Sequence, residues 1–270
     1  MEYSKISMGR YVGSLVLFAA IVGLGVLWLN GNSPDKKPAE LAPVATSTPK
    51  ISALPDVAFF EDVQTETIKK TAFPTGKKDP ANLVTAVGEY PINTPFAKVA
   101  ETHVKGIIQN FIEQYSDQKD IVTSGGVNAE SSVAFSRGKK LFSYLYSDYT
   151  EEGGAHGNIQ FSSETLDMNG RKYILGDLFL PKTDYLGIFS QMAIVHFVKD
   201  TYVAFDPKDA TFGKGLDPKP ENFAAFFISG DKIIFQFQNY QIGPYSEGPQ
   251  RFEVSVKDPE ISKIVRPELF

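Results

Sequence analysis

The sequence predicts an α+β fold in which an antiparallel sheet packs with two amphipathic helices, preceded by one N-terminal transmembrane helix. The first observation is the order of the segments: strands, a helix, a longer set of strands, a second helix and final strands. This order differs from the regular β-α alternation of a parallel sheet. The second is an uncharged apolar run near the N-terminus, separated from the rest by a proline-rich stretch.

Composition limits the classes of function. The chain has 270 residues, of which 42% are hydrophobic, so a sizeable core is expected. A net charge of -5 argues against a general nucleic-acid binder, because such a protein neutralises phosphates with a basic surface. The absence of cysteine excludes disulfides, thiolate metal sites and cysteine nucleophiles.

The apolar run Tyr11–Leu29 has the length that a bilayer core requires of a helix, about 20 residues. Lys5 and Arg10 precede it, whereas the next basic residues after it stand beside Asp35. This bias places the N-terminal tail, residues 1–10, in the cytoplasm and the rest of the chain outside. We therefore predict a single-pass protein of the cell membrane. A cleaved signal peptide is the alternative, but the run exceeds a usual h-region and no clear Ala-x-Ala site follows.

Residues 30–56 are rich in Pro, Ala, Ser and Thr. The prolines recur almost regularly, at Pro34, Pro38, Pro43, Pro49 and Pro55. A segment with so little to bury is an extended tether.

Two strands are predicted in the first part of the folded region, within residues 57–73 and 82–92, where β-branched and polar residues alternate. Residues 96–115 then carry apolar side chains at helical spacing along one face. Thr94 followed by Pro95 resembles an N-cap with proline at the first helical position. This helix is expected to pack on a sheet.

The strands that follow are predicted from short apolar runs. Residues 132–135 and 141–149 are strand-like and flank the turn 136–139. Residues 159–166 and 172–175 flank Asn169-Gly170, a strong hairpin signal that favours a type I′ turn with positive φ at both central residues.

The last third of the chain is predicted to contain the second amphipathic helix, over residues 184–199, followed by a loop. An antiparallel meander then covers residues 223–228, 232–237 and 251–256, where apolar residues alternate with polar ones.

Several motifs, taken in order, resemble a known pair of domains. They are Glu89-Tyr90-Pro91 before the first helix, the stretch from Tyr149-Thr150 to Gly153-Gly154-Ala155-His156, Gly176-Asp177-Leu178-Phe179, and Tyr240-Gln241-Ile242-Gly243-Pro244-Tyr245 with Gly248. The set resembles a tandem pair of bacterial extracytoplasmic domains: the deacetylase PdaC domain of unknown function and its usual C-terminal partner. Such pairs form the outer part of lysozyme-sensing anti-sigma factors and precede the catalytic domain of some peptidoglycan deacetylases.

The resemblance implies a domain over residues 57–160, a partner domain over residues 161–258 and a C-terminal tail over residues 259–270. It also implies a membrane-tethered envelope protein that recognises a cell-wall glycan or a muramidase-like protein. Glu151 and Glu152 depart from the pattern, because the family usually joins Tyr-Thr directly to Gly-Gly-Ala-His. The sigma-binding segment and the metal-dependent deacetylase domain are missing, so neither activity carries over whole.

His156 has two interpretations. Beside Glu151 and Glu152 it could bind a metal or act as an acid or base. Alternatively, the glycines supply positive φ in a turn and the imidazole bonds to backbone. We favour the turn, because a metal usually needs three or four protein ligands and only His103 and His196 remain. We expect His196 to be a hydrogen-bonded core residue and His103 to lie on a solvated or boundary face. No cofactor or metal is predicted.

The aromatic residues Tyr240 and Tyr245, with Phe237 nearby, also have two interpretations. They could stack on sugar rings or form a protein-binding patch. They could equally be sheet core next to a Gly-Pro turn. The two interpretations remain open. A serine hydrolase is unsupported, since Ser131, Ser132 and Ser136 are not in a Gly-x-Ser-x-Gly context.

The sequence hypothesis is a non-enzymatic binding module that recognises peptidoglycan or a lysozyme-type muramidase. Its predicted binding residues lie on two loops, residues 149–158 and 240–248: Tyr149, Gly153, Gly154, His156, Asn158, Tyr240 and Tyr245. One alternative is an envelope glycan hydrolase or deacetylase that uses His156 and neighbouring carboxylates. Another is an envelope scaffold without a small ligand.

Overall fold

The computed structural model describes residues 63–73, 83–116, 126–199 and 205–270. All of these belong to one compact unit, Ile51–Phe270. The predicted transmembrane run and tether lie outside the described residues. No helix within the described ranges is long and apolar enough to cross a bilayer.

The first sheet has six strands, in the spatial order β1-β2-β3-β4-β5-β6. Their bounds are β1 Thr65–Ala72, β2 Val84–Pro91, β3 Val127–Arg137, β4 Leu141–Glu151, β5 Asn158–Asp167 and β6 Lys172–Tyr173. The prediction of a wholly antiparallel sheet is wrong at one place, because β2 and β3 are parallel. The reason is the connection: the chain between them passes through helix α1, and a crossover of this kind returns the next strand in the same direction.

Helix α1 (Ala97–Ser116) packs against the first sheet through one apolar stripe, as predicted. Its start differs from the prediction. Phe96 has a left-handed φ of 59°, so neither Thr94 nor Pro95 occupies the expected capping position. Thr94 Oγ1 instead lies 3.0 Å from the hydroxyl of Tyr144, which also donates to the Pro95 carbonyl. A tyrosine of the sheet therefore holds the turn before the helix.

The second sheet is the predicted antiparallel meander, with strands β7 (Phe226–Ser229), β8 (Lys232–Gln236) and β9 (Arg251–Ser255). Helix α2 (Tyr185–Lys199) packs on it. The two helices and the α+β class are thus confirmed, with two sheets in place of one.

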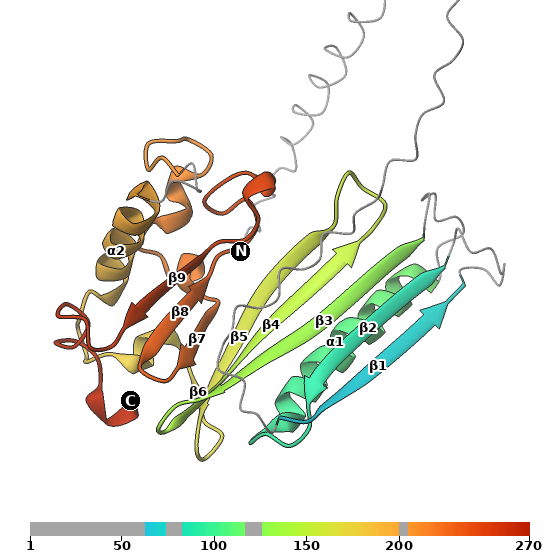
Figure 1. The fold of residues 1–270 in the computed structure, drawn as a ribbon, viewed down its shortest axis with the longest axis horizontal. Coiled ribbons are helices and arrows are strands. Elements are labelled where there is room, and N and C mark those ends of the chain that lie inside the picture. Colours follow the sequence, from blue (N-terminus) through green and yellow to red (C-terminus); the bar gives the residue numbers. More distant parts are fainter. Residues whose placement is uncertain (1–62, 74–82, 117–125, 200–204) are drawn as a thin grey trace, which may run out of the picture. The chain divides into compact units, whose positions relative to one another are not determined.

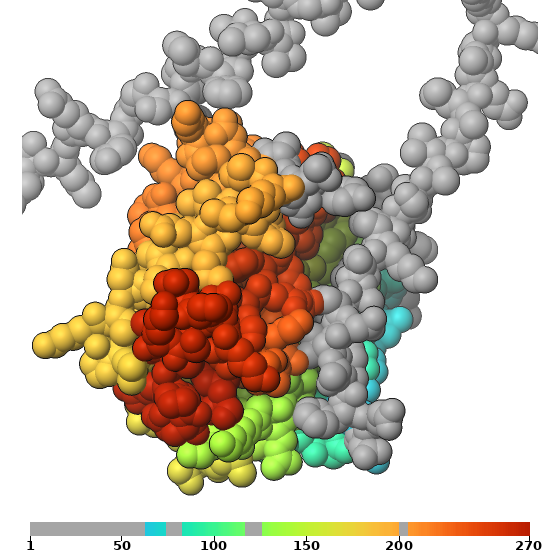
Figure 2. All heavy atoms as spheres, turned by 60° about the vertical axis from the view of Figure 1, so that its left-hand side comes forward, coloured from blue at the N-terminus to red at the C-terminus, as the bar shows by residue number. Residues whose placement is uncertain are grey.

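The elements form layers (Figure 1), and three hydrophobic clusters lie between or beside them. One cluster lies between α1 and the first sheet, and a small one, which includes Leu145, Phe161 and Phe227, joins the two sheets. The largest contains α2, the outer face of the second sheet and the segment after β9. Figure 2 shows this C-terminal segment, in dark red, on the surface beside the α2 region. Val265 bridges Phe179 there, so residues 259–270 are packed into the fold.

The predicted hairpin at Asn169-Gly170 joins β5 and β6, but its turn is not type I′. Only Gly170 has a positive φ, of 81°. The Gly170 N–H donates to the Asp167 carbonyl and the Asp167 N–H to the Arg171 carbonyl. This is a three-residue loop with glycine in the left-handed position. The Asp167 carboxylate favours it by accepting the Asn169 and Arg171 N–H groups.

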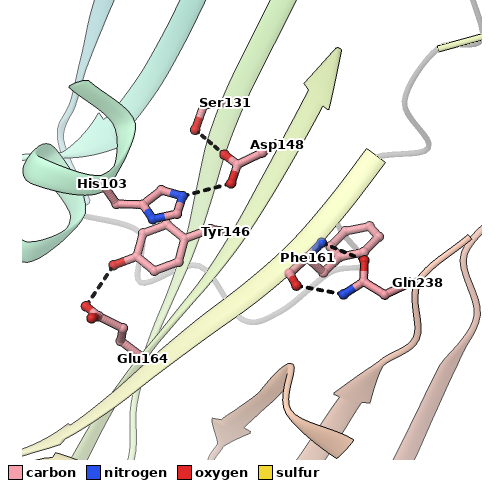
Figure 3. A network of polar contacts seen from close by, with 7 residues as sticks. All are labelled: His103, Ser131, Tyr146, Asp148, Phe161, Glu164 and Gln238. Atoms are coloured by element: carbon pink, nitrogen blue, oxygen red, sulfur yellow. Dashed lines mark hydrogen bonds and ion pairs between the residues drawn. The ribbon is translucent and has the colours of Figure 1, made fainter. Parts of the chain in front are cut away.

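Side chains of the first sheet pair with backbone N–H groups at the free, buried edge of the second sheet. The N–H of Phe226 donates to Ser163 Oγ at 3.0 Å, and that of Ile228 to Ser143 Oγ at 3.2 Å. In the opposite direction, the Gln238 side chain bonds to both backbone groups of Phe161 on β5 (Figure 3). Since unpaired edge groups are costly when buried, these bonds hold the sheets in one register.

Candidate functional site

The two loops predicted to carry the binding residues meet in the structure. The first joins β4 to β5 and the second joins β8 to β9. His156 of the first loop stacks on Tyr245 of the second, with ring centroids 3.6 Å apart and an interplanar angle of 16°. Tyr240 lies beside both rings, and its hydroxyl is 2.9 Å from His156 Nε2. We call His156, Tyr240 and Tyr245 the aromatic cluster.

Both ring nitrogens of His156 are occupied. Nδ1 lies 2.9 Å from the Gly157 carbonyl oxygen, which only accepts, so Nδ1 carries a proton. In the neutral ring Nε2 is then the acceptor, and the Tyr240 hydroxyl donates to it. No lone pair of the imidazole remains for a metal or for proton abstraction. The geometry suits a fixed aromatic platform better than an acid–base group.

Tyr149 and Gly157 form the base of the first loop. The Tyr149 ring lies so close to Gly157 that a Cβ at position 157 would be 2.1 Å from the Tyr149 hydroxyl oxygen. Gly153 has a φ of 79°, the left-handed conformation that glycine adopts without strain. Gly154 and Asn158 are exposed, and the structure does not bring them into the aromatic cluster. Four of the seven predicted residues thus meet or support one surface, and Gly153 shapes the turn.

Tyr240 is held in an unfavourable backbone conformation. Its φ is 63°, a region that costs a non-glycine residue roughly 1–2 kcal/mol. Its side chain is 50% exposed, so core packing does not explain the strain. Strained residues that the surrounding structure holds in place concentrate at functional sites. Tyr240 is therefore a strong candidate for ligand contact.

Gln238 positions the second loop. Its Oε1 accepts from the Phe161 N–H at 2.9 Å and its Nε2 donates to the Phe161 carbonyl at 2.7 Å. The amide thus takes the place of a neighbouring strand at the free edge of β5. Because Gln238 stands two residues before Tyr240, this clamp fixes the second loop against the strand that begins after His156.

The charge around the aromatic cluster is negative. Burial raises the pKa of the Tyr149 phenol to about 12, with further contributions from the charge of Glu151 and its hydrogen bond. Burial, followed by the charge of Glu151, also raises the pKa of Tyr245. Both phenols are therefore neutral at physiological pH and keep their protons for hydrogen bonding.

A second polar group lies between α1 and the first sheet (Figure 3). His103 stacks on Tyr146 with centroids 3.8 Å apart, and its Nε2 lies 2.8 Å from Asp148 Oδ2. Asp148 Oδ1 accepts from Ser131 Oγ at 2.6 Å. The carboxylate stands between the serine and the histidine, which is the wrong order for a nucleophile–base pair. The group fastens α1 to β3 and β4, and His103 occupies the boundary position expected of it.

The expectation for His196 is wrong. This residue is exposed on α2, where its ring contacts Phe197 and Phe252. Helix α2 is apolar nearly all round, with Val195 and Val198 also more than half exposed. Periodicity could not identify the buried face of such a helix. Within the described ranges, no group of three or more His, Asp or Glu residues is arranged to hold a metal ion.

Sequence reasoning missed Gln238 and the His103–Asp148 pair. For Asp148 a signal exists, because its carboxylate lies within β4 directly after a run of residues buried on both faces, and a carboxylate there must find a partner. For Gln238 the only signal is a glutamine that continues the alternation Phe235-Gln236-Phe237 past the end of β8.

Comparison with known proteins shows what parts of this chain are similar to. Residues 176–257 match the family described as Protein of unknown function (DUF3298). The chain is 25% identical over 174 residues to peptidoglycan-N-acetylmuramic acid deacetylase PdaC of Bacillus subtilis (strain 168). The aligned region is 61% of this chain. The same region spans only 37% of the length of that relative.

One solved structure shows a similar fold, and a second was also matched. A DUF3298 family protein from Pseudomonas aeruginosa PAO1 has a TM-score of 0.52 and 17% identity. The match covers 77% of this chain and 96% of the chain in that structure. A DUF3298 family member from Bacteroides fragilis NCTC 9343 has a TM-score of 0.49 and 19% identity, and the match covers 74% of this chain and 92% of the other. The matched region includes the loop of Tyr240 and Tyr245 and begins after the loop of His156 has ended. Residues 176–257 are thus similar to the DUF3298 family, and the chain is similar at low identity to a protein named as a peptidoglycan deacetylase.

Proposed function

We propose that the chain is a membrane-anchored, extracytoplasmic binding module whose aromatic cluster recognises the glycan of peptidoglycan. The observation that carries the proposal is the meeting of His156 with Tyr240 and Tyr245, although His156 and Tyr240 lie 84 residues apart in the chain. A relative whose name refers to peptidoglycan supports the choice of ligand. The anchor and the cellular address rest on the uncharged run near the N-terminus.

The chemistry of the aromatic cluster suits a sugar. Aromatic rings offer rigid apolar faces, and tyrosine hydroxyls add polar tips at low entropic cost. A sugar ring presents apolar C–H faces and polar hydroxyl edges, which match this combination. Tyr240 is half exposed and held by its bond to His156, so its ring is available at the surface and its hydroxyl oxygen can still accept a hydrogen bond. Pre-organised surfaces of this kind bind without a large ordering cost.

The occupied nitrogens of His156 count against the enzyme alternative. A hydrolase or deacetylase that used this ring would first have to break a bond to Gly157 or Tyr240. No carboxylate contacts the imidazole among the bonds of the described residues. A muramidase-like protein is the other partner that the family resemblance implies, and the test below separates it from the glycan.

The test measures binding of the purified full chain to soluble peptidoglycan fragments and, in parallel, to a lysozyme-type muramidase. The recovered glycan is analysed in the same samples. We expect saturable binding of the fragments with unchanged glycan. Tyr245→Ala should weaken binding about five- to thirtyfold, as the loss of an aromatic contact residue costs about 1–2 kcal/mol.

The matched control is Tyr173→Ala. Tyr173 lies on β6, which pairs with β5 at the end of β5 that is distant from the aromatic cluster. It should leave glycan affinity unchanged. Modified glycan would establish the enzyme alternative. Binding of the muramidase alone would transfer the site to a protein partner. Binding of neither, or equal loss in both variants, would refute the proposed site.

A further inference from the structure

Glu151 brings a fixed carboxylate to the aromatic cluster. It is the last residue of β4, and its side chain turns back so that Oε2 accepts from the Tyr149 hydroxyl at 3.2 Å. Oε1 accepts from the Gly153 N–H at 3.3 Å. Its charge acts on both Tyr149 and Tyr245, because it contributes to the raised pKa of each phenol. The carboxylate is thus held beside the rings by groups of its own loop.

No cation neutralises this charge within the part of the chain that the structure describes. Neither Glu151 nor Glu130, whose charge also acts on Tyr149, takes part in an ion pair there. Residues 149–158 and 240–250 contain no lysine or arginine. Arg251, which follows the second loop, is paired with Glu253. The aromatic cluster therefore lies in a negative field that a ligand could compensate.

Aromatic faces beside a free carboxylate form a site for an ammonium group. The ring quadrupole attracts a cation to its face, with about 0.5–1 kcal/mol at exposed positions. A carboxylate has about four lone-pair positions, and Glu151 uses two for the bonds to Tyr149 and Gly153. An N-acetyl group carries no charge and gains nothing from this field. A sugar with a free amino group places an ammonium next to its stackable ring.

We infer that the aromatic cluster and Glu151 together select glycans with free amino groups, that is, de-N-acetylated amino sugars, over fully N-acetylated ones. The inference rests on the proposed function, since it names the substrate class of the same site. It concerns selectivity alone, so it can fail while glycan binding stands. A lysine-rich protein surface would also present ammonium groups, but without sugar rings. The test below distinguishes such a protein ligand from an amino sugar by including an oligolysine.

The experiment compares glucosamine oligosaccharides with N-acetylglucosamine oligosaccharides of equal length, using the full chain. Dissociation constants are measured for both, at low and moderate salt, together with an oligolysine of equal charge. We expect the amino form to bind about three- to tenfold tighter, from a cation–π contact and one weakly screened carboxylate. The ratio should fall as salt is added.

Glu151→Gln and Glu152→Gln form a matched pair, because each removes one negative charge from neighbouring positions. The Glu152 carboxylate hydrogen-bonds to Tyr115 at the end of α1 and raises the pKa of that phenol after burial does. Glu151→Gln should bring the affinity ratio close to one, and Glu152→Gln should preserve it.

Each outcome decides one question. Equal binding of both oligosaccharides by the unmodified chain would overturn the selectivity and leave the proposed function standing. Binding of neither would overturn both. A preference that persists in Glu151→Gln, or falls equally in Glu152→Gln, would show general attraction to an acidic protein and overturn the assignment to Glu151. Oligolysine binding as tight as that of the amino sugar would overturn the choice of a glycan.

Discussion

Substitution of Gln238 tests how the fold positions the second loop. Gln238→Met keeps the length of the side chain but removes both bonds to the Phe161 backbone. Each such bond contributes about 0.5–1.5 kcal/mol net, so the free energy of unfolding should fall by about 1–3 kcal/mol. The upper part of this range applies because the Phe161 groups lose partners in a partly buried place between the sheets.

The assay is urea denaturation of the full chain, with stability taken from the midpoint and slope. Amide hydrogen exchange of the Phe161 segment reports the same clamp locally and should become faster. Gln160→Met is the control, because Gln160 is the exposed neighbour on β5 and surface changes of this kind stay within about 0.5 kcal/mol. Unchanged stability together with unchanged exchange in Gln238→Met would refute the clamp.

Three further predictions concern the loops themselves. Gly157→Ala should lower the free energy of unfolding by about 1–3 kcal/mol in urea denaturation, since its Cβ would overlap the Tyr149 hydroxyl; an unchanged midpoint would contradict that contact. The folded pKa of Tyr149, about 12, lies above its ordinary value of 10.0, so its contribution to stability is present below pH 10 and is lost as pH rises through about 12. Thermal melting across that range should show a smaller loss for Tyr149→Phe, and equal losses would refute the shift. Tyr240→Gly should be about 1 kcal/mol more stable than Tyr240→Ala, because glycine relieves the φ of 63°; equal melting temperatures would show that no strain is stored there.

The elements whose pattern is local were predictable. The single apolar stripe of α1 determines which face the helix buries, and the structure bears this out. The position of β8 was also predictable, but its alternation does not separate a buried from an exposed face, because residues 233–236 are all buried. Asn169-Gly170 indicated a hairpin correctly, but Asp167 selected a different turn by bonding to the loop N–H groups. That choice depends on side-chain hydrogen bonds that a two-residue signal does not include.

Other features depend on contacts distant in sequence. The start of α1 shifted because Tyr144, far along the chain, holds the preceding turn at Thr94. The parallel pairing of β2 and β3 follows from the crossover through α1, which segment order alone does not reveal. The face of α2 that contains His196 was unpredictable, because nearly every side of that helix is apolar.

The candidate site was predictable in its loops but not in its contacts. Glycine, histidine and tyrosine marked the two loops in the sequence. The stacking of His156 on Tyr245 requires the packing of two sheets, and the Gln238 clamp that sets it has almost no sequence signal. The role of these residues in binding stays a prediction.

The measurement that tests the central claim most directly is oxidative footprinting of the full chain with and without peptidoglycan fragments, read by mass spectrometry. Tyr240 is 50% exposed and should become protected when the glycan binds, together with His156 and Tyr245. Met168, 55% exposed in the turn at the opposite end of β5, should oxidise equally in both samples. Protection elsewhere on the chain, with Tyr240 unchanged under saturating glycan, would contradict the assignment of the aromatic cluster as the binding site.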